Sequence, residues 1–495
     1  MTDQPQGDPR HLETLDRDLA RFSYLETATT MVARPTVGLG VSFVFVVLAG
    51  LAAMLFFGQA NNTFIVVVAA SLGAYMALNI GANDVANNMG PAVGANALSM
   101  GGAIAIAVIF ESAGALIAGG DVVSTIAKGI IEPESMGTAT VFIWAMMAAL
   151  LSAALWVNLA TWVGAPVSTT HSVVGGVMGA GIAAAGFAAV NWPTMGAIAA
   201  SWVISPVLGG VIAALFLALI KTRIIYQEDK IAAARVWVPV LVGIMAGAFA
   251  SYLALKGLKK IIKIDMPTAL MIGAAVGGLI WLAMIPVIRK QSEGLENRNK
   301  SLKVLFGIPL VVSAALLSFA HGANDVANAV GPLAAIVQAS QSGDFTQAVS
   351  IPVWVMIIGA FGISFGLFLF GPKLIRMVGG QITKLNPMRA YCVALSAAIT
   401  VIVASWLGLP VSSTHIAVGA VFGVGFFREW DAERRIRKAR LAMPDRPAYA
   451  PEERRRRKLV RRSHFMTIIA AWVITVPAAA VLSGVIFFLI STAMG

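Results

Sequence analysis

Charged residues are scarce in this chain of 495 residues, because Asp, Glu, Lys and Arg together make up only 12% of it. A soluble protein of ordinary composition carries about 25% charged residues, so the composition excludes a typical soluble domain. Several segments, such as residues 37–57 and 138–162, are almost free of charge over the length that spans a bilayer core. They are too long and too uniformly apolar for barrel strands. The chain is therefore predicted to be an all-α polytopic membrane protein.

Cysteine is nearly absent from the chain, and its first residues do not have the pattern of a signal peptide. The single Cys392 excludes an internal disulfide and a cysteine-based metal cluster. The first 30 residues are polar and of mixed charge, so they lack the basic-then-apolar layout of a cleaved signal. We expect residues 1–36 to form a polar cytoplasmic tail, and we expect no cofactor.

Positive charge is concentrated near the C-terminus. Between Arg428 and Arg462 there are 14 Arg or Lys residues and 6 Asp or Glu residues. Cytoplasmic loops carry an excess of Lys and Arg, so residues 428–462 are predicted to form a basic cytoplasmic loop. A contact with anionic lipid or a regulatory partner is the alternative. Nucleic-acid binding is not expected for a loop between membrane spans.

Two polar strings occur twice in this apolar chain. The string Gly-Ala-Asn-Asp-Val-Ala-Asn fills residues 81–87 and returns at 322–328, each time followed by Gly-Pro three residues later. Pro-Val-Ser-Thr-Thr-His at 166–171 matches Pro-Val-Ser-Ser-Thr-His at 410–415. The order is the same in both halves, which indicates an internal duplication of the kind that many transporters contain.

The duplication divides the chain into a regular plan. We expect an extra helix at 37–58, a first repeat at 62–220, two connecting helices with cytoplasmic linkers at 221–302, and a second repeat at 303–493. Five spans in the first repeat and two in the connection make the second repeat enter from the opposite face, so the repeats are predicted to be inverted.

The prediction is about 12 or 13 transmembrane helices, with broken or re-entrant segments near the motifs. Residues 84–97 and their counterpart are the candidates for re-entrant segments. A cytoplasmic N-terminus places most basic loops inside, in a multi-pass protein of the plasma (inner) membrane.

The acidic string has the chemistry of a cation site. Asp and Asn disfavour helix interiors, and Gly81 before them and Pro91 after them are expected to interrupt the helix. Carboxylate, amide and freed carbonyl oxygens are hard ligands that suit a small hard cation, or a carboxylate that takes up a proton. A buried Asn/Asp cluster that only ties helices together is the structural alternative.

The hydroxyl string has the chemistry of an anion site. Pro permits a new helix start, where Ser and Thr occupy cap positions and free N–H groups sit at the positive end of the helix dipole. Two opposed helix starts of this kind suit one tetrahedral oxyanion. Ordinary helix capping is the structural alternative. His171 and His415 are more simply explained as hydrogen-bond partners than as proton carriers, and Glu111 as either a paired structural acid or a proton site.

Both doubled strings resemble the signature of the inorganic phosphate transporter (PiT) family. The resemblance implies an inverted-repeat helical fold, uptake of orthophosphate driven by Na⁺ or H⁺, and often a homodimer. It places phosphate contacts on six hydroxyl residues: Ser168, Thr169, Thr170, Ser412, Ser413 and Thr414. It places cation contacts on six residues of the acidic strings: Asn83, Asp84, Asn87, Asn324, Asp325 and Asn328. The partners it implies are phosphate, the coupling cation and the lipid bilayer.

Three other functions fit parts of the pattern. A sulfate permease would use the same hydroxyls and helix ends, since both anions are tetrahedral. An intramembrane hydrolase would use Ser168, His171 and an Asp, although every candidate occurs twice and a nucleophile–base pair is needed only once. An anion channel would need no coupling cation.

Overall fold

The computed structural model describes residues 37–58, 62–163, 167–257, 264–342, 351–381, 386–442 and 462–494. Within these ranges the chain is helical apart from short loops, and its only β-contact is an isolated bridge between Ile131 and Val190. The predicted tail 1–36 and residues 443–461 of the predicted basic loop lie outside the described residues.

The helices follow the order expected from the duplication. After a first helix, Val37–Phe57, come α2 (Thr63–Asn83), α3 (Val85–Gly94), α4 (Met100–Ala118), α5 (Gly120–Ser124), α6 (Ala139–Val163), α7 (Thr169–Ala185) and α8 (Trp192–Ile220). The connecting helices are α9 (Lys230–Lys256) and α10 (Met266–Gln291). Then follow α11 (Asn299–Leu305), α12 (Gly307–Ser342), α13 (Val353–Gln381), α14 (Pro387–Trp406), α15 (Ser413–Ala442) and α17 (Arg462–Met494).

Within the described ranges, 11 helices are long and apolar enough to cross a membrane, with α2 and α3 counted together as Thr63–Gly94. Within the two repeats the sequence also predicts spans at 172–190 and 412–427, and these are not among them. The first falls on α7, which has 17 residues, and the second on α15, whose charged second half lowers its mean hydropathy. Both begin at a hydroxyl string, and the apolar part of α15 is confined to its first half.

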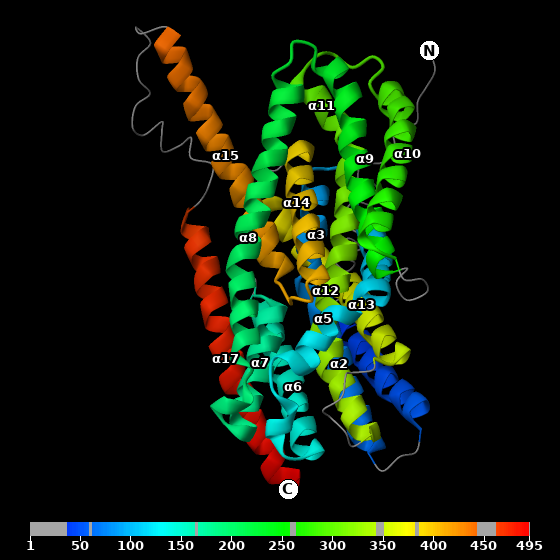
Figure 1. Cartoon of the computed structure of the whole chain (residues 1–495), viewed down its shortest axis with the longest axis vertical. Coiled ribbons are helices and arrows are strands. Elements are labelled where there is room, and N and C mark those ends of the chain that lie inside the picture. Colours follow the sequence, from blue (N-terminus) through cyan, green and yellow to red (C-terminus); the bar gives the residue numbers. More distant parts are fainter. Residues whose placement is uncertain are drawn as a thin grey trace, which may run out of the picture.

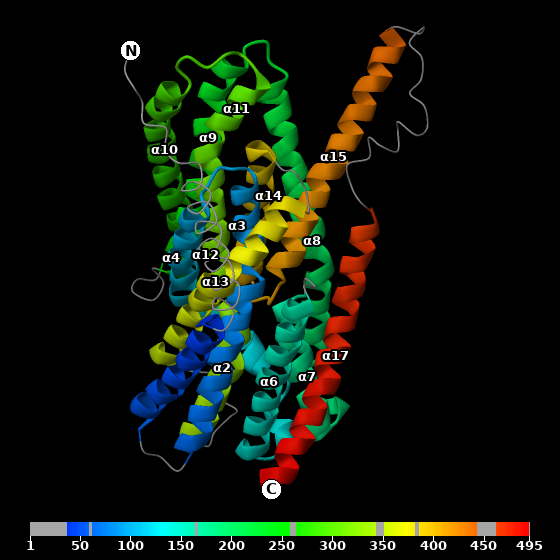
Figure 2. The same ribbon diagram turned by 180° about the vertical axis from the view of Figure 1, so that it is seen from behind.

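The two halves run in opposite directions. Figures 1 and 2 show α2 and α3 rising from the lower end, whereas α12 descends from the upper end. The pair α6 and α7 forms a hairpin that enters from the lower end, and α14 with α15 forms the matching hairpin in the upper half. This is the inverted arrangement that the sequence predicts. Each hydroxyl string lies at the tip of a hairpin, near the middle of the bundle.

Two local expectations about the acidic strings are wrong. Residues 84–97 are not re-entrant, because α2 and α3 continue in one direction with only Asp84 unassigned between them, and its backbone remains α-helical (φ −89°, ψ −34°). The second copy is not interrupted at all, since α12 runs through it and through Pro332. The surrounding helices bury nearly the whole segment, and this packing tolerates the lost backbone hydrogen bond.

The repeats interlock rather than lying side by side, because helices of one repeat pack on helices of the other. α2 packs on α13 and α12 on α4, and in the same way α7 packs on α17 and α15 on α8. Glycines make these crossings close: a Cβ at Gly179 would lie 2.2 Å from the carbonyl oxygen of Ala480, and one at Gly423 2.0 Å from that of Gly210. The hairpin tips are thus held by the opposite half.

Candidate functional site at the hairpin tips

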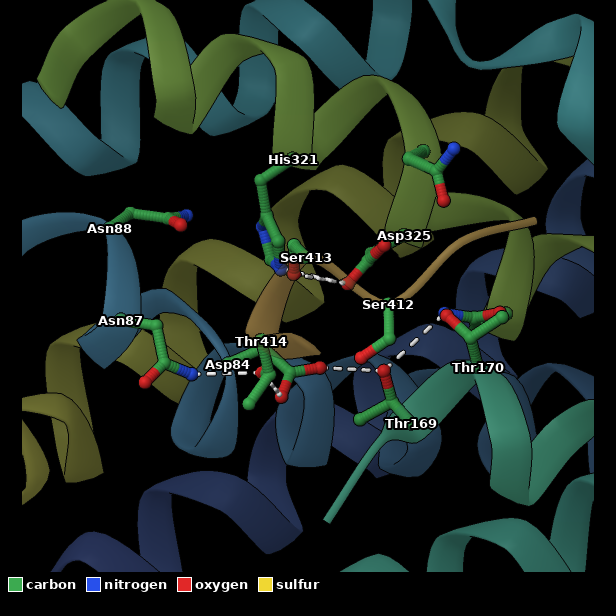
Figure 3. A network of polar contacts seen from close by, with 12 residues as sticks. Asp84, Asn87, Asn88, Thr169, Thr170, His321, Asp325, Ser412, Ser413 and Thr414 are labelled. Atoms are coloured by element: carbon green, nitrogen blue, oxygen red, sulfur yellow. Dashed lines mark hydrogen bonds and ion pairs between the residues drawn. The ribbon is translucent and has the colours of Figure 1, made fainter. Parts of the chain in front are cut away.

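The two acidic strings meet at one place inside the bundle (Figure 3). Carboxylate oxygens of Asp84 and Asp325 and a ring nitrogen of His321 all lie within 4.8 Å of one another. The three residues are buried, at 2% exposure or less. Acids removed from water in this way need compensating partners, so their hydrogen bonds decide what the site can do.

Asp84 is held by hydroxyls from both hairpins. Oγ1 of Thr169 donates to its Oδ2 at 2.6 Å, and Oγ1 of Thr414 donates to its Oδ1 at 3.2 Å. Nδ2 of Asn87 in turn donates to Oγ1 of Thr414 at 2.9 Å. A carboxylate of the first repeat therefore bridges the tips of α7 and α15, as Figure 3 shows.

Asp325 has a different environment. Its Oδ2 lies 2.8 Å from Nε2 of His321, at ion-pair distance though not aligned as a hydrogen bond, and Oγ of Ser413 donates to the same oxygen at 3.4 Å. Among the described residues, no hydrogen-bond donor reaches its Oδ1 or Oδ1 of Asn328. Buried oxygens without a donor are suited to a cation, because a cation supplies the missing positive partner.

The remaining asparagines of the strings support the hairpins. Nδ2 of Asn83 donates to Oγ1 of Thr161 near the end of α6 at 2.8 Å. Nδ2 of Asn324 donates to Oγ of Ser405 at 2.9 Å, and its Oδ1 accepts from the backbone N–H of Val411 at 3.2 Å. These contacts place Asn83 and Asn324 on the chain segments that lead into the hydroxyl strings.

The first serine of each hydroxyl string caps its helix. Oγ of Ser168 accepts from the N–H of His171 at 3.1 Å, and Oγ of Ser412 accepts from the N–H of His415 at 3.3 Å. Such caps stabilise a helix by about 1 kcal/mol. The other hydroxyls point to neighbouring oxygens, and Oγ1 of Thr170, for instance, donates to the carbonyl of Val411 at 3.0 Å while accepting from Asn328 at 3.2 Å.

The two histidines of the hydroxyl strings pack on each other, with ring centroids 4.5 Å apart, and Trp202 lies edge-on to His171 at 3.8 Å. Within the described residues no hydrogen bond joins the Ser168 hydroxyl to the His171 ring. In the described part of the chain, Ser168 and His171 therefore do not form a nucleophile–base pair.

Sequence reasoning missed His321 and left the role of Glu111 open. Nδ1 of His321 lies 2.6 Å from Oε2 of Glu111, and Nδ2 of Asn88 donates to Oε1 of Glu111 at 2.9 Å. The available signals were an acid inside an apolar span and a histidine directly before the second acidic string. A neutral imidazole carries one N–H. Both ring nitrogens of His321 face a carboxyl group, so one further proton must be shared among Glu111, His321 and Asp325.

The comparisons with known proteins agree with this architecture. A sequence model of the group described as "Phosphate transporter family" matches residues 80–483, which include both copies of both strings. The chain belongs to this family. The resemblance to the inorganic phosphate transporter family, drawn from the motifs, is thereby confirmed. The first helix, Val37–Phe57, lies outside the matched residues.

Relatives match over nearly their whole length. A Helicobacter pylori strain J99 protein named "Putative phosphate permease" is 45% identical over 523 aligned residues, which cover 95% of this chain and 98% of the relative. A Pyrococcus abyssi protein with the same designation is 36% identical over 416 residues, covering 84% of this chain and 95% of its own. A solved structure titled "The sodium-dependent phosphate transporter" is 34% identical with a TM-score of 0.78, and the match covers 87% of this chain and all 100% of that one.

Proposed function

We propose that this protein imports inorganic phosphate across the plasma membrane by symport with Na⁺ or H⁺. The observation that carries the proposal is the meeting of Asp84 and Asp325 in one buried cluster beside the hydroxyl tips of two opposed half-helices. Membership of a phosphate transporter family supports the substrate. The solved relative whose title names sodium dependence supports the coupling.

The hydroxyls link the cation to the anion. Thr169 and Thr414 donate their protons to Asp84, and a hydroxyl has only one proton to donate. A cation, or a proton, on Asp84 takes the place of these donors and frees them for phosphate oxygens. The backbone N–H groups at the starts of α7 and α15 add positive ends of helix dipoles to the same anion.

Charge makes phosphate binding depend on the cation. Two unit charges about 5 Å apart at an effective dielectric of about 20 repel by roughly 3 kcal/mol, which is about a hundredfold in affinity. Phosphate near two ionised aspartates meets more than one such repulsion. Binding is therefore weak until a cation neutralises the carboxylates, and this mutual dependence is the coupling. Transport then proceeds by rocking of the interlocked halves around the site.

The orientation in the membrane follows from the basic helix ends. The ends of α8, α10 and α15 lie together at one end of the bundle in Figures 1 and 2. Lys221 and Arg223 follow α8 directly, and Arg289 and Lys290 lie in the last turn of α10. The proposal places this end and the N-terminus in the cytoplasm. A homodimer remains a prediction from the family resemblance.

The experiment that tests the proposal imposes the two gradients separately. Purified protein in liposomes is expected to accumulate radiolabelled phosphate against its gradient when an inward Na⁺ or H⁺ gradient is applied, and to stop when an ionophore collapses it. Uptake that only follows the phosphate gradient would instead identify a channel. Unlabelled sulfate that competes better than unlabelled phosphate would identify a sulfate permease.

A second test addresses the hydroxyls. Thr169→Val and Thr414→Val keep the side-chain shape but remove the donor, so each is expected to raise the phosphate KM about tenfold or more, since a charge-assisted hydrogen bond is lost. Ser318→Ala serves as the control, because Ser318 is a buried hydroxyl residue of α12 that lies outside the cluster. An unchanged KM in both threonine variants, measured as initial uptake at a saturating cation concentration, would remove them from the phosphate site.

A further inference from the structure

The site is asymmetric although the fold around it is symmetric. A Cβ added to Gly81 in α2 would lie 1.9 Å from the carbonyl oxygen of Ile363 in α13. A Cβ added to Gly322 in α12 would lie 2.2 Å from the carbonyl oxygen of Glu111 in α4. The two glycines are equivalent in the duplicated string, so Ile363 and Glu111 occupy equivalent places. One half has an apolar side chain there and the other has an acid.

The same difference recurs at two neighbouring positions. His321 directly precedes the second acidic string, whereas Ile80 precedes the first. Asn88 directly follows the first string, whereas Ala329 follows the second. Because the backbone crossings match, the apolar half shows that the fold can close around isoleucine and alanine at these places. Packing alone therefore does not require the polar residues.

The three polar residues form one connected arm that ends on Asp325. Asn88 donates to Glu111 at 2.9 Å, Glu111 lies 2.6 Å from Nδ1 of His321, and Nε2 of His321 lies 2.8 Å from Asp325. All four side chains are at most 1% exposed. A buried chain of this kind has no water to replace a lost partner, so it fixes the imidazole and, through it, the carboxylate. Figure 3 shows His321 and Asp325 facing each other, with Asn88 on the far side.

We propose that Asn88, Glu111 and His321 are positioning residues that fix Asp325 and make its cation site different from that of Asp84. This inference rests on the proposed function. The arm occupies Oδ2 of Asp325 and leaves Oδ1 without a hydrogen-bond donor among the described residues. Among the described side chains, the hydrogen-bond donors to Asp84 are hydroxyls that phosphate also needs. Asp325 therefore binds its cation before phosphate arrives, and the Asp84 site fills together with phosphate.

The apolar half of the molecule supplies the test. The triple variant Asn88→Ala, Glu111→Ile and His321→Ile copies the residues that stand at the equivalent places. It removes Glu111 together with its histidine, so Glu111 is not left buried without a partner, and Asp325 keeps the hydroxyl of Ser413 as Asp84 keeps those of Thr169 and Thr414. It is expected to fold, to keep its phosphate KM within about twofold at saturating cation, and to need about tenfold more cation for half-maximal uptake. That is the usual range for losing a partner that orients a metal ligand.

Two further variants separate positioning from structure. Glu111→Gln retains the hydrogen bonds to Asn88 and His321, so its half-maximal cation concentration is expected to lie nearer to the wild type than that of the triple variant. Ser112→Ala removes a partly buried hydrogen bond of 2.8 Å to Ser364 where α4 crosses α13, and it is expected to leave the cation dependence unchanged.

The titration uses Na⁺ or H⁺, whichever drives the wild-type protein, and monodispersity in detergent reports folding. A folded triple variant with the wild-type cation dependence would overturn the inference, and so would a variant that loses phosphate affinity to the same degree as cation affinity. If the triple variant does not fold, the Glu111→Gln variant decides. A half-maximal cation concentration as in the wild type supports positioning by hydrogen bonds. Loss of the cation dependence contradicts positioning by hydrogen bonds. A wild-type protein that neither cation drives would refute the proposed function instead.

Discussion

Asp84→Asn and Asp325→Asn are each expected to reduce cation-driven phosphate accumulation by about a hundredfold or more. Neutralising either carboxylate removes the charge that attracts the cation, and one such pair contributes roughly 3 kcal/mol at the separations and dielectric of a protein interior. Asn keeps the size of Asp and can still accept a hydrogen bond, so the fold is expected to survive. The measurement is radiolabelled phosphate uptake into liposomes under an imposed cation gradient.

The two variants are expected to fail in different ways. Asp84→Asn removes the charge that the cation needs and one of the two oxygens that accept from Thr169 and Thr414. Stimulation of uptake by the cation is therefore expected to be lost, while exchange of phosphate across the membrane persists. Asp325→Asn removes the carboxylate on which the arm of His321 and Glu111 ends. Both the exchange and the accumulation of phosphate are therefore expected to fall.

Asp121→Asn is the matched control, because it removes a carboxylate that pairs with Lys256 and is 48% exposed. Exposed ion pairs contribute at most about 1 kcal/mol, so this variant is expected to transport like the wild type. Wild-type accumulation by Asp84→Asn and Asp325→Asn would show that these acids do not couple the cation to phosphate.

The glycines of the acidic strings are expected to be the most sensitive positions for folding. Gly81→Ala and Gly322→Ala place a methyl group 1.9 Å and 2.2 Å from backbone carbonyl oxygens of the facing helices, and neither oxygen can move without shifting its helix. Overpacking of this kind costs about 3 kcal/mol or more. Both variants are expected to show a clearly lower unfolding temperature in detergent, or to be recovered only as aggregate.

Gly278→Ala is the control for the change from glycine to alanine. It lies in α10, and among the described residues no heavy atom outside its chain neighbours and the backbone of its own helix lies within 4 Å of the added Cβ. Because alanine favours a helix over glycine by about 0.5–1 kcal/mol, this variant is expected to be as stable as the wild type or slightly more stable. A Gly322→Ala protein with wild-type thermal stability would show that the close crossing is not required.

The sequence by itself determined the class, the family and the plan of this protein. Apolar runs of spanning length require helices, because backbone groups in lipid must be paired within their own segment. The repeated strings at 81–87, 322–328, 166–171 and 410–415 then identified the inverted repeats and the residues that meet at the centre. These conclusions depend on local properties, namely residue type, spacing and order, which can be seen without any contact.

Tertiary structure decided which atoms meet. The sequence shows that Asp84 and Thr414 are both polar, but only the crossing of the halves places them 3.2 Å apart. The same packing kept α12 continuous through its acidic string and made the hairpin tips the true re-entrant points. It also joined Glu111 to His321, 210 residues apart in the chain. Such contacts form because interlocked helices leave a buried polar group only the partners that the opposite half supplies.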